Sequence, residues 1–248
     1  MPEGRLIVLA GPSCVGKSPL DKALARFHPE LREPLRPVVL YNDRAPRPGE
    51  VDGVDYHFRS SAEIQALESS ADHVVMDVRG DLQALDVAGL KAALQAGDAF
   101  FEGNPFVGRR LLNDKRLADV PTLGVFMAPL AREEIRYLRD TAGDAALPGL
   151  VTDVMRRKLL RRMRKQKSEL SLKDLENIET RAGSAYRELQ MAHEFAAVLP
   201  NHDGEDSENW DAFYYPLGDA RRVLIAFVEL LRGLFPEGAE KWEADLLP

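Results

Sequence analysis

The chain has 248 residues, of which 45% are hydrophobic and 29% are charged, and its formal net charge at pH 7 is -7. This composition is typical of a folded protein with a sizeable core, and the acidic balance argues against broad binding to nucleic acids or membrane surfaces. A single cysteine, Cys14, excludes an internal disulfide framework and a cysteine-rich zinc site. At the N-terminus no basic start precedes a long apolar run, so we expect a cytoplasmic protein that does not span a membrane.

An apolar run near the N-terminus leads directly into a glycine-rich loop. Residues 6–10 read Leu-Ile-Val-Leu-Ala, which predicts a buried strand, and the pattern Gly-x4-Gly-Lys-Ser follows at once. Such a loop points successive backbone NH groups at phosphate oxygens, and the helix behind it adds a partial positive charge. The sequence therefore predicts a nucleoside triphosphate site formed by Gly11, Pro12, Ser13, Cys14, Val15, Gly16, Lys17 and Ser18.

Two side chains of this loop have distinct expected roles. Lys17 would reach the outer phosphates of a nucleoside triphosphate, and the Ser18 hydroxyl would take one coordination position on Mg2+. The alternative is a chance match to a short pattern. The strand before the loop and the helical spacing of apolar residues after it favour a true phosphate-binding loop.

A polar segment rich in proline and glycine follows a second strand expected at residues 37–41. Residues 42–58 cannot form a long helix, so we expect an extended loop or a hairpin there. The segment carries Arg44, Arg47 and Tyr56, which offer the guanidinium and hydroxyl groups that a second anion site needs. A solvated surface loop is the alternative, since arginine, proline and glycine are common in such loops.

Together these two segments resemble guanylate kinase. The phosphate-binding loop is followed, at the spacing of that family, by Arg44-Ala-Pro-Arg47-Pro-Gly-Glu-Val-Asp-Gly-Val-Asp-Tyr56-His-Phe58. The resemblance implies an α/β protein with the P-loop NTPase fold, in which helices flank a parallel sheet and a nucleoside-monophosphate-binding subdomain and a helical lid are added. It also implies that Arg44, Arg47 and Tyr56 hold the phosphate of the acceptor nucleotide.

The resemblance further implies how the chain is divided. We expect one guanylate-kinase-like domain over residues 1–248, with the acceptor subdomain at about 41–95 and the lid, including an insertion, at about 139–189. The core would then comprise residues 1–40, 96–138 and 190–248. Proline and glycine between residues 140 and 150 predict an irregular connection inside the lid region.

The part of the family pattern that reads the guanine base is largely replaced. Asp77, which ends a strand expected at residues 73–77, is the nearest counterpart of the family's guanine-binding glutamate. Leu40 stands where a base-contacting serine is expected, and residues 79–86 replace a Gly-Asn-Tyr-Tyr-Gly-type segment. GMP is the acceptor that the family implies, but the sequence leaves another acceptor open.

Three further candidates lie at the ends of expected strands. Glu102 and Asn104 close a strand at residues 98–104 and occupy the places of an acidic pair that lies near the acceptor and the metal in the family. Ligands of open α/β sheets gather at such strand ends, although a solvated carboxylate is the alternative for Glu102. Asn201 ends the last expected strand, residues 196–201, and by resemblance would face the adenine of ATP.

A basic amphipathic helix is expected over residues 154–167. It is open to three interpretations: a solvated charged face, a nucleic-acid-binding arm, or a lid that presents guanidinium groups to the transferred phosphoryl. Its position favours the lid. The next expected helix, residues 174–189, places Arg181 at the family's phosphate-contacting arginine, while the lid arginine that joins it is left open among Arg161, Arg162 and Arg164.

The function implied is ATP-dependent phosphoryl transfer to a nucleoside monophosphate, GMP to GDP in the first place, with Lys17, Arg44 and Arg181 as catalytic groups. This reaction requires positioning and charge neutralisation rather than a protein nucleophile. Two alternatives stay open: a P-loop kinase of another phosphorylated acceptor, and a guanylate-kinase-like module that binds without turnover. The intact Lys17 argues against the binding module.

Overall fold

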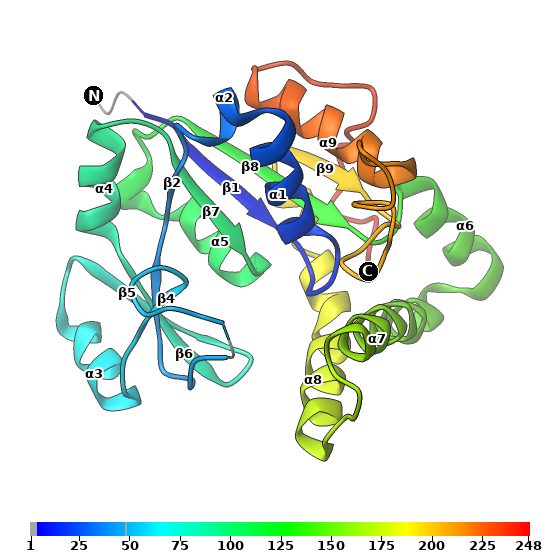
Figure 1. The fold of residues 1–248 in the computed structure, drawn as a ribbon, viewed down its shortest axis with the longest axis horizontal. Helices are drawn as coiled ribbons and strands as arrows, with labels where there is room; N and C mark the ends of the chain where they lie inside the picture. Colours follow the sequence, from blue (N-terminus) through cyan, green and yellow to red (C-terminus); the bar gives the residue numbers. More distant parts are fainter. Residues whose placement is uncertain (1–3, 48) are drawn as a thin grey trace.

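A computed structural model describes residues 4–47 and 49–248; residues 1–3, on which the expected lack of an export signal partly rests, lie outside the described residues. Five parallel strands form the central sheet, in the order β2-β7-β1-β8-β9 (Figure 1). The strands are β1 (Leu6–Ala10), β2 (Arg36–Pro37), β7 (Ala99–Gly103), β8 (Thr122–Ala128) and β9 (Ala197–Pro200).

Helices cover both faces of this sheet because its central strand is apolar on both sides. In β1, Ile7 and Leu9 belong to one apolar cluster together with α1 (Lys17–Phe27) and α9 (Gly218–Leu231). Leu6 and Val8 belong to the opposite cluster, to which α5 (Pro105–Asn113) and α8 (Leu172–Leu189) contribute. The observed architecture is therefore the helix-flanked parallel sheet that the sequence predicts.

A smaller, four-stranded sheet lies beside the core, in the order β4-β3-β6-β5. Its strands are β3 (Leu40–Asn42), β4 (Tyr56–Phe58), β5 (His73–Val78) and β6 (Asp81–Asp86). The helix α3 (Ser61–Ala66) packs against this sheet, whereas α4 (Val87–Gln95) contacts both β5 and β7 of the central sheet. The strand expected at residues 37–41 is thus divided between the two sheets. Residues 79–86, for which the sequence predicted no element, contribute β6, which pairs with β5 through a two-residue turn at Arg79 and Gly80.

The expected irregular connection at residues 140–150 is mostly helical, so that prediction was wrong. The helix α6 (Arg132–Ala142) runs into this stretch, and α7 (Leu147–Gln166) begins after one 3-10 turn, Asp144–Ala146. Pro148 lies in the first turn of α7, where a helix has no internal use for the missing NH group. Proline here starts a helix rather than interrupting one.

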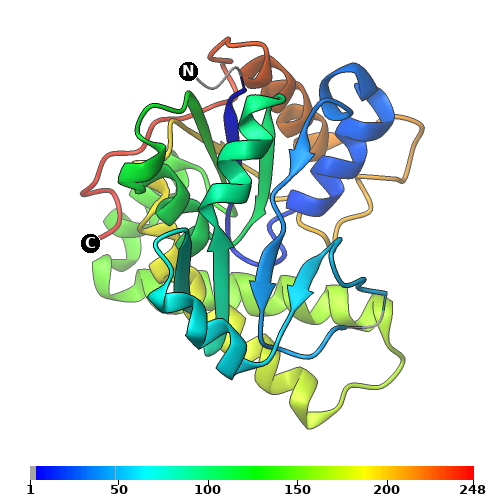
Figure 2. The same ribbon diagram turned by 90° about the vertical axis from the view of Figure 1, so that its left-hand side faces the viewer.

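The helices α7 and α8 pack against each other below the sheet (Figure 1), and Met155 and Leu159 of α7 are buried in the core cluster. Figure 2 shows this pair and the smaller sheet on the same side of the core. The remaining helical segments are α2 (Pro29–Arg32) and the 3-10 turns Leu67–Ser69, Lys115–Leu117 and Ala192–Glu194. Among the described helices, none combines the length and the apolar character that crossing a membrane requires.

Candidate active site

One polar cavity of about 280 Å3 opens between the phosphate-binding loop, the smaller sheet and the helices α7 and α8. Most of the residues expected at the site line it, from segments far apart in the sequence. They are Gly11, Ser13, Cys14, Lys17, Ser18, Arg44, Arg47, Tyr56, Glu102, Asn104 and Arg181. Pro12, Val15 and Gly16 complete the loop behind this lining.

The phosphate-binding loop has the backbone that its pattern predicts. Gly16 has a φ of 107°, and a Cβ atom there would lie 2.5 Å from the Asn201 side chain, so both conformation and space require glycine. Cys14 also has a positive φ, 70°, and its side chain is fully buried. Burial, reinforced by the charges of Glu205 and Asp206, raises the pKa of the Cys14 thiol to about 12. Cys14 is therefore an unreactive packing residue.

The side chain of Lys17 folds back across the phosphate-binding loop. Its Nζ atom donates hydrogen bonds to the carbonyl oxygens of Gly11 (2.8 Å) and Pro12 (2.9 Å), and its side chain is buried. Burial lowers the pKa of Lys17, while the carboxylates of Glu205 and Glu102 act in the opposite direction. A buried cation facing a polar cavity is suited to binding an anion.

The ends of β1 and β7 bring Ser18 and Glu102 into contact. The Ser18 hydroxyl donates a 2.8 Å hydrogen bond to Oε1 of Glu102. Burial raises the pKa of the Glu102 carboxyl, against the opposing effects of Lys17 and the Ser18 hydrogen bond. Asn104, two residues on, lines the same cavity and caps α5, because its Oδ1 accepts the NH of Val107 at 3.0 Å.

The residues predicted to form a second anion site are held together by contacts within the smaller sheet and the loop before β4. The Arg44 guanidinium makes a two-pronged ion pair with Glu50, at 2.7 and 2.6 Å, and stacks 5.0 Å from the Tyr56 ring centre. Glu50 also accepts the backbone NH of Arg47 at 2.7 Å. Among described residues, the Arg47 guanidinium makes no ion pair and so remains available to an anion. Glu50 lies within the quoted family segment, but nothing in the sequence pattern singled it out as a partner of Arg44.

Several cations converge from the helices onto the same cavity. Burial, together with the nearby charges of Arg47, Arg79 and Arg162, lowers the pKa of Arg181 to about 10. Of the three lid arginines left open by the sequence, Arg162 lines the cavity, whereas Arg161 and Arg164 do not. Guanidinium groups at such short range repel one another, so their clustering requires acidic partners or bound anions nearby.

The cavity also contains residues that the sequence did not single out, chiefly Arg79, Asp81, Gln83 and Glu205. Glu205 comes from the long loop after β9 and pairs with Arg162 of α7 at 2.6 Å. Two neighbouring acidic residues of this loop also form ion pairs with α7. The carboxylate of Asp206 lies 3.9 Å from the ammonium of Lys158 and 3.6 Å from the guanidinium of Arg161, and that of Glu208 lies 3.7 Å from the ammonium of Lys165. We call these four contacts the acidic-loop pairs.

Asp77 does not lie where the resemblance implied. Its side chain is on the exposed face of β5, outside the cavity, and its Oδ1 accepts the NH of Gly80 at 3.0 Å. The residue stabilises the β5–β6 turn, because it satisfies a backbone donor at the tip. The expectation that Asp77 contacts the base is corrected accordingly.

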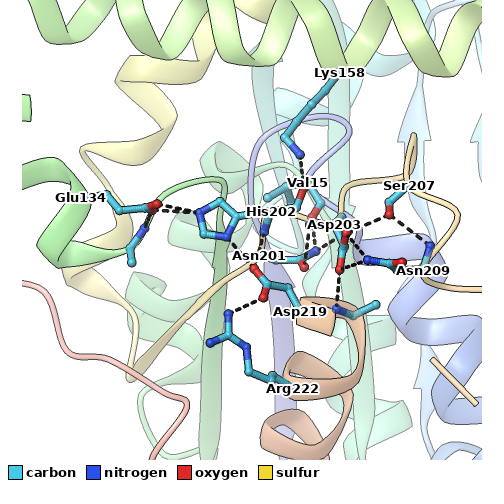
Figure 3. A network of polar contacts seen from close by, with 12 residues as sticks. Val15, Glu134, Lys158, Asn201, His202, Asp203, Ser207, Asn209, Asp219 and Arg222 are labelled. Atoms are coloured by element: carbon cyan, nitrogen blue, oxygen red, sulfur yellow. Dashed lines mark hydrogen bonds and ion pairs between the residues drawn. The ribbon is translucent and has the colours of Figure 1, made fainter. Parts of the chain in front are cut away.

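Asn201 also differs from its expected role, because its side chain is fully buried and offers no surface to an adenine base. Its Nδ2 atom donates to the carbonyl oxygens of Val15 and Asp203, each at 2.7 Å, so it ties the phosphate-binding loop to the loop after β9 (Figure 3). Asp203 in turn accepts hydrogen bonds from Ser207 and Asn209. Asn201 thus supports the phosphate-binding loop from behind.

Replacing Asn201 by alanine is expected to lower the free energy of unfolding by about 2 kcal/mol, because the buried carbonyl of Val15 loses this donor and the carbonyl of Asp203 keeps only the Trp210 indole N–H. Denaturant unfolding measures the change. Asn113→Ala is the matched control, since Asn113 is exposed and its amide bonds the carbonyl of Arg109 on the helix surface. Equal losses in both variants would contradict the supporting role of Asn201.

His202 extends this network between two helices. Its ring lies between Glu134 of α6, at 2.9 Å, and Asp219 of α9 (Figure 3). Partial burial disfavours the charged ring, but hydrogen bonds to these two carboxylates outweigh that effect and raise the pKa of His202. Its carbonyl oxygen accepts a hydrogen bond from Lys158 of α7. The loop after β9 is therefore fastened to α6, α7 and α9 at once.

Comparisons with known proteins identify relatives of this chain. Residues 3–84 match the family model described as guanylate kinase. The chain is 32% identical over 203 residues to the guanylate kinase of Rhodococcus jostii, which covers 81% of each chain. It is 35% identical over 145 residues to the guanylate kinase of Cereibacter sphaeroides, a match that spans 57% of this chain and 66% of that relative.

A solved structure gives the same result for the fold. The guanylate kinase from Anaplasma phagocytophilum superposes with a TM-score of 0.53 at 16% identity, over 94% of this chain and 87% of that one. That likeness shows the fold, and the Rhodococcus relative, matched over most of both sequences, shows the family. The chain therefore belongs to the guanylate kinase family.

Proposed function

We propose that the chain transfers the terminal phosphoryl group of ATP to the phosphate of a nucleoside monophosphate, with GMP as the expected acceptor. The observation that carries this proposal is the convergence of two anion sites on one cavity. Lys17 and the phosphate-binding loop line this cavity together with Arg44 and Arg47, which come from the loop before β4. Two phosphate sites that share a cavity suit direct transfer between two nucleotides.

In this reaction an oxygen of the acceptor phosphate forms a bond to the terminal phosphorus, while the bond from that phosphorus to its bridging oxygen breaks. The protein must hold both anions in line and neutralise charge between them. We assign Lys17 to the outer phosphates of the donor, and Arg44, Arg47 and Tyr56 to the acceptor phosphate. Arg181, joined by Arg162, would neutralise the charge on the group in transit.

Ser18 and Glu102 suit a magnesium ion. Hydroxyl and carboxylate oxygens are ligands that Mg2+ prefers, and their side chains are already in contact at the phosphate-binding loop. No cluster of three or more metal-binding side chains occurs in residues 4–47 and 49–248, so phosphate oxygens and water would complete the shell. When bound, Mg2+ would supply positive charge to the donor phosphates.

We also propose which part of the chain binds each substrate and which part forms the lid. Residues 41–95, which hold most of the smaller sheet, would bind the acceptor, and residues 139–189, which hold α7 and α8, would act as the lid. The core, residues 1–40, 96–138 and 190–248, would bind the donor. Closure of the lid would exclude water from the transfer and so prevent wasteful hydrolysis of ATP.

The test is ADP release from ATP and Mg2+ with GMP, dGMP, AMP, CMP or UMP as acceptor, with Lys17→Ala as the blank. We expect turnover that depends on an acceptor and is fastest with GMP. No turnover with any of the five, although ATP binds, would overturn the proposal.

A second candidate is the same transfer to an acceptor other than GMP. It is favoured by the position of Asp77 on the outer face of β5 and by Leu40, which is buried and offers no polar group to a base. The same acceptor series decides between the two candidates. Turnover with another monophosphate that exceeds turnover with GMP would support the second.

A further inference from the structure

Arg79 occupies an unusual backbone position at the tip of the smaller sheet. It is the first residue of the two-residue turn between β5 and β6 and has a φ of 59°, with Gly80 following at 90°. Glycine and asparagine are the usual residues in such a turn, because a larger side chain rarely adopts this conformation. The turn directs a long cationic side chain away from its own sheet.

The Arg79 guanidinium bridges three parts of the molecule. Its Nε and Nη2 atoms donate to Oε1 of Glu188 on α8, with an Nε to Oε1 distance of 2.8 Å. Its Nη1 atom lies 3.3 Å from the hydroxyl of Ser13 in the phosphate-binding loop. The smaller sheet, the proposed lid and the phosphate-binding loop therefore meet at the Arg79 side chain.

Glu188 is built to hold this guanidinium in place. Its side chain is fully buried, and the Ser184 hydroxyl donates to the same Oε1 atom at 2.6 Å. A buried carboxylate needs a compensating cation, and Arg79 is its ion-pair partner among the described residues. Orientation by a fixed carboxylate leaves the guanidinium with little freedom to rotate.

The contacts that hold Arg79 in place do not use all of its N–H groups. Its bonds use one N–H on each of its three nitrogens, so Nη1 and Nη2 each keep a second N–H. The side chain lines the same cavity as Lys17 and Arg181. Because Nη1 lies beside Ser13 and the side chain lines the cavity, these N–H groups are close to the phosphate-binding loop.

We propose that Arg79 contacts the terminal phosphoryl group of the nucleoside triphosphate, and that Glu188 is the positioning residue that orients it. The inference deepens the proposed function and rests on it for the transfer step, but the contact itself is measurable without turnover. Because Arg79 belongs to the smaller sheet, it would contact the terminal phosphate only when that sheet lies against the phosphate-binding loop.

The contact is tested by comparing two ligands that differ in the terminal phosphate. Calorimetry measures the affinity of the whole chain for ADP and for the non-hydrolysable analogue AMPPNP, each with Mg2+. Arg79→Gln is expected to weaken AMPPNP binding about 10-fold or more, because a charge-assisted hydrogen bond is lost, and to change ADP binding less than about 2-fold. Arg59→Gln is the matched control, because Arg59 lies in the same region, pairs with Asp52 and does not line the cavity.

Glu188→Gln should lower the preference for AMPPNP over ADP by a smaller factor, because the guanidinium remains but loses its charged anchor. Should Arg79→Gln fail to fold, Arg79→Lys serves in its place: a lysine keeps a charge beside Glu188 but lacks the planar fork of donors, so it should also lower the preference for AMPPNP over ADP. The inference would be overturned if the Arg79 variant kept the wild-type preference for AMPPNP over ADP. It would also be overturned if the variant bound both ligands more weakly by the same factor.

These results separate the inference from the proposed function. If no acceptor supports turnover but Arg79→Gln still selectively weakens AMPPNP, the transfer proposal fails and the contact stands. If turnover occurs but the preference for AMPPNP is unchanged in the variant, the contact fails and the transfer proposal stands. A wild-type chain that binds neither ligand would overturn the inference as well.

Discussion

Replacing Lys17 by alanine is expected to lower the turnover number of phosphoryl transfer by about a hundred- to a thousand-fold. The ammonium group is buried beside the phosphate-binding loop, where water screens it little, so its loss removes a large share of the charge stabilisation. Initial rates at saturating ATP and acceptor measure the effect. Lys22→Ala, on the exposed side of the same helix, is the matched control and should retain its rate.

Unfolding cannot account for this loss. Burial lowers the pKa of Lys17, which means that the folded state disfavours its charged form at neutral pH. Removing the cation takes away a desolvation cost, but it also leaves the carbonyl oxygens of Gly11 and Pro12 without this donor, so Lys17→Ala should lose no more than about 2 kcal/mol of stability. A variant that is unfolded under the assay conditions would contradict a specific role for Lys17 in binding the transferred group.

Replacing Arg47 by glutamine is expected to raise the KM for the acceptor about 10- to 100-fold, while the KM for ATP changes little. The Arg47 guanidinium lines the cavity and has no ion-pair partner among the described residues, so its free N–H groups suit the acceptor phosphate. Initial rates over a range of acceptor and ATP concentrations give both constants.

Arg59→Gln serves again as the control for a lost surface arginine. Equal increases in both KM values for the Arg47 variant would contradict an acceptor-specific role. Arg44 is a poorer target for this experiment. Its removal would leave the partly buried Glu50 without its cation, so lost binding and lost structure would be mixed.

The sequence predicted best the features that depend on local pattern. The phosphate-binding loop and its strand lie within a few residues of each other, and glycine at position 16 is needed for a left-handed backbone that no other residue adopts easily. Arg44, Arg47 and Tyr56 were found because they belong to one continuous segment with fixed spacing. They line the same cavity as the loop.

Contacts between distant segments could not be predicted in the same way. Arg79 and Glu188 are 109 positions apart, and their pairing depends on where a hairpin tip and a helix end meet. Asp77 was misplaced because one edge strand does not reveal which of its two faces will be covered. Asn201 was misplaced because a side chain at a strand end can point either at a ligand or under a loop, and here it lies under the loop.

The acidic-loop pairs have a consequence for the kinetics of the lid. If α7 opens and closes in each cycle, as we propose, these contacts to the loop after β9 must break before products leave. Added salt weakens such pairs, so product release should become faster as ionic strength rises while the time spent closed becomes shorter. The loop after β9 would thus slow the opening of the lid, and the size of this effect would depend on ionic strength. Stopped-flow measurement of nucleotide release at several salt concentrations tests this expectation.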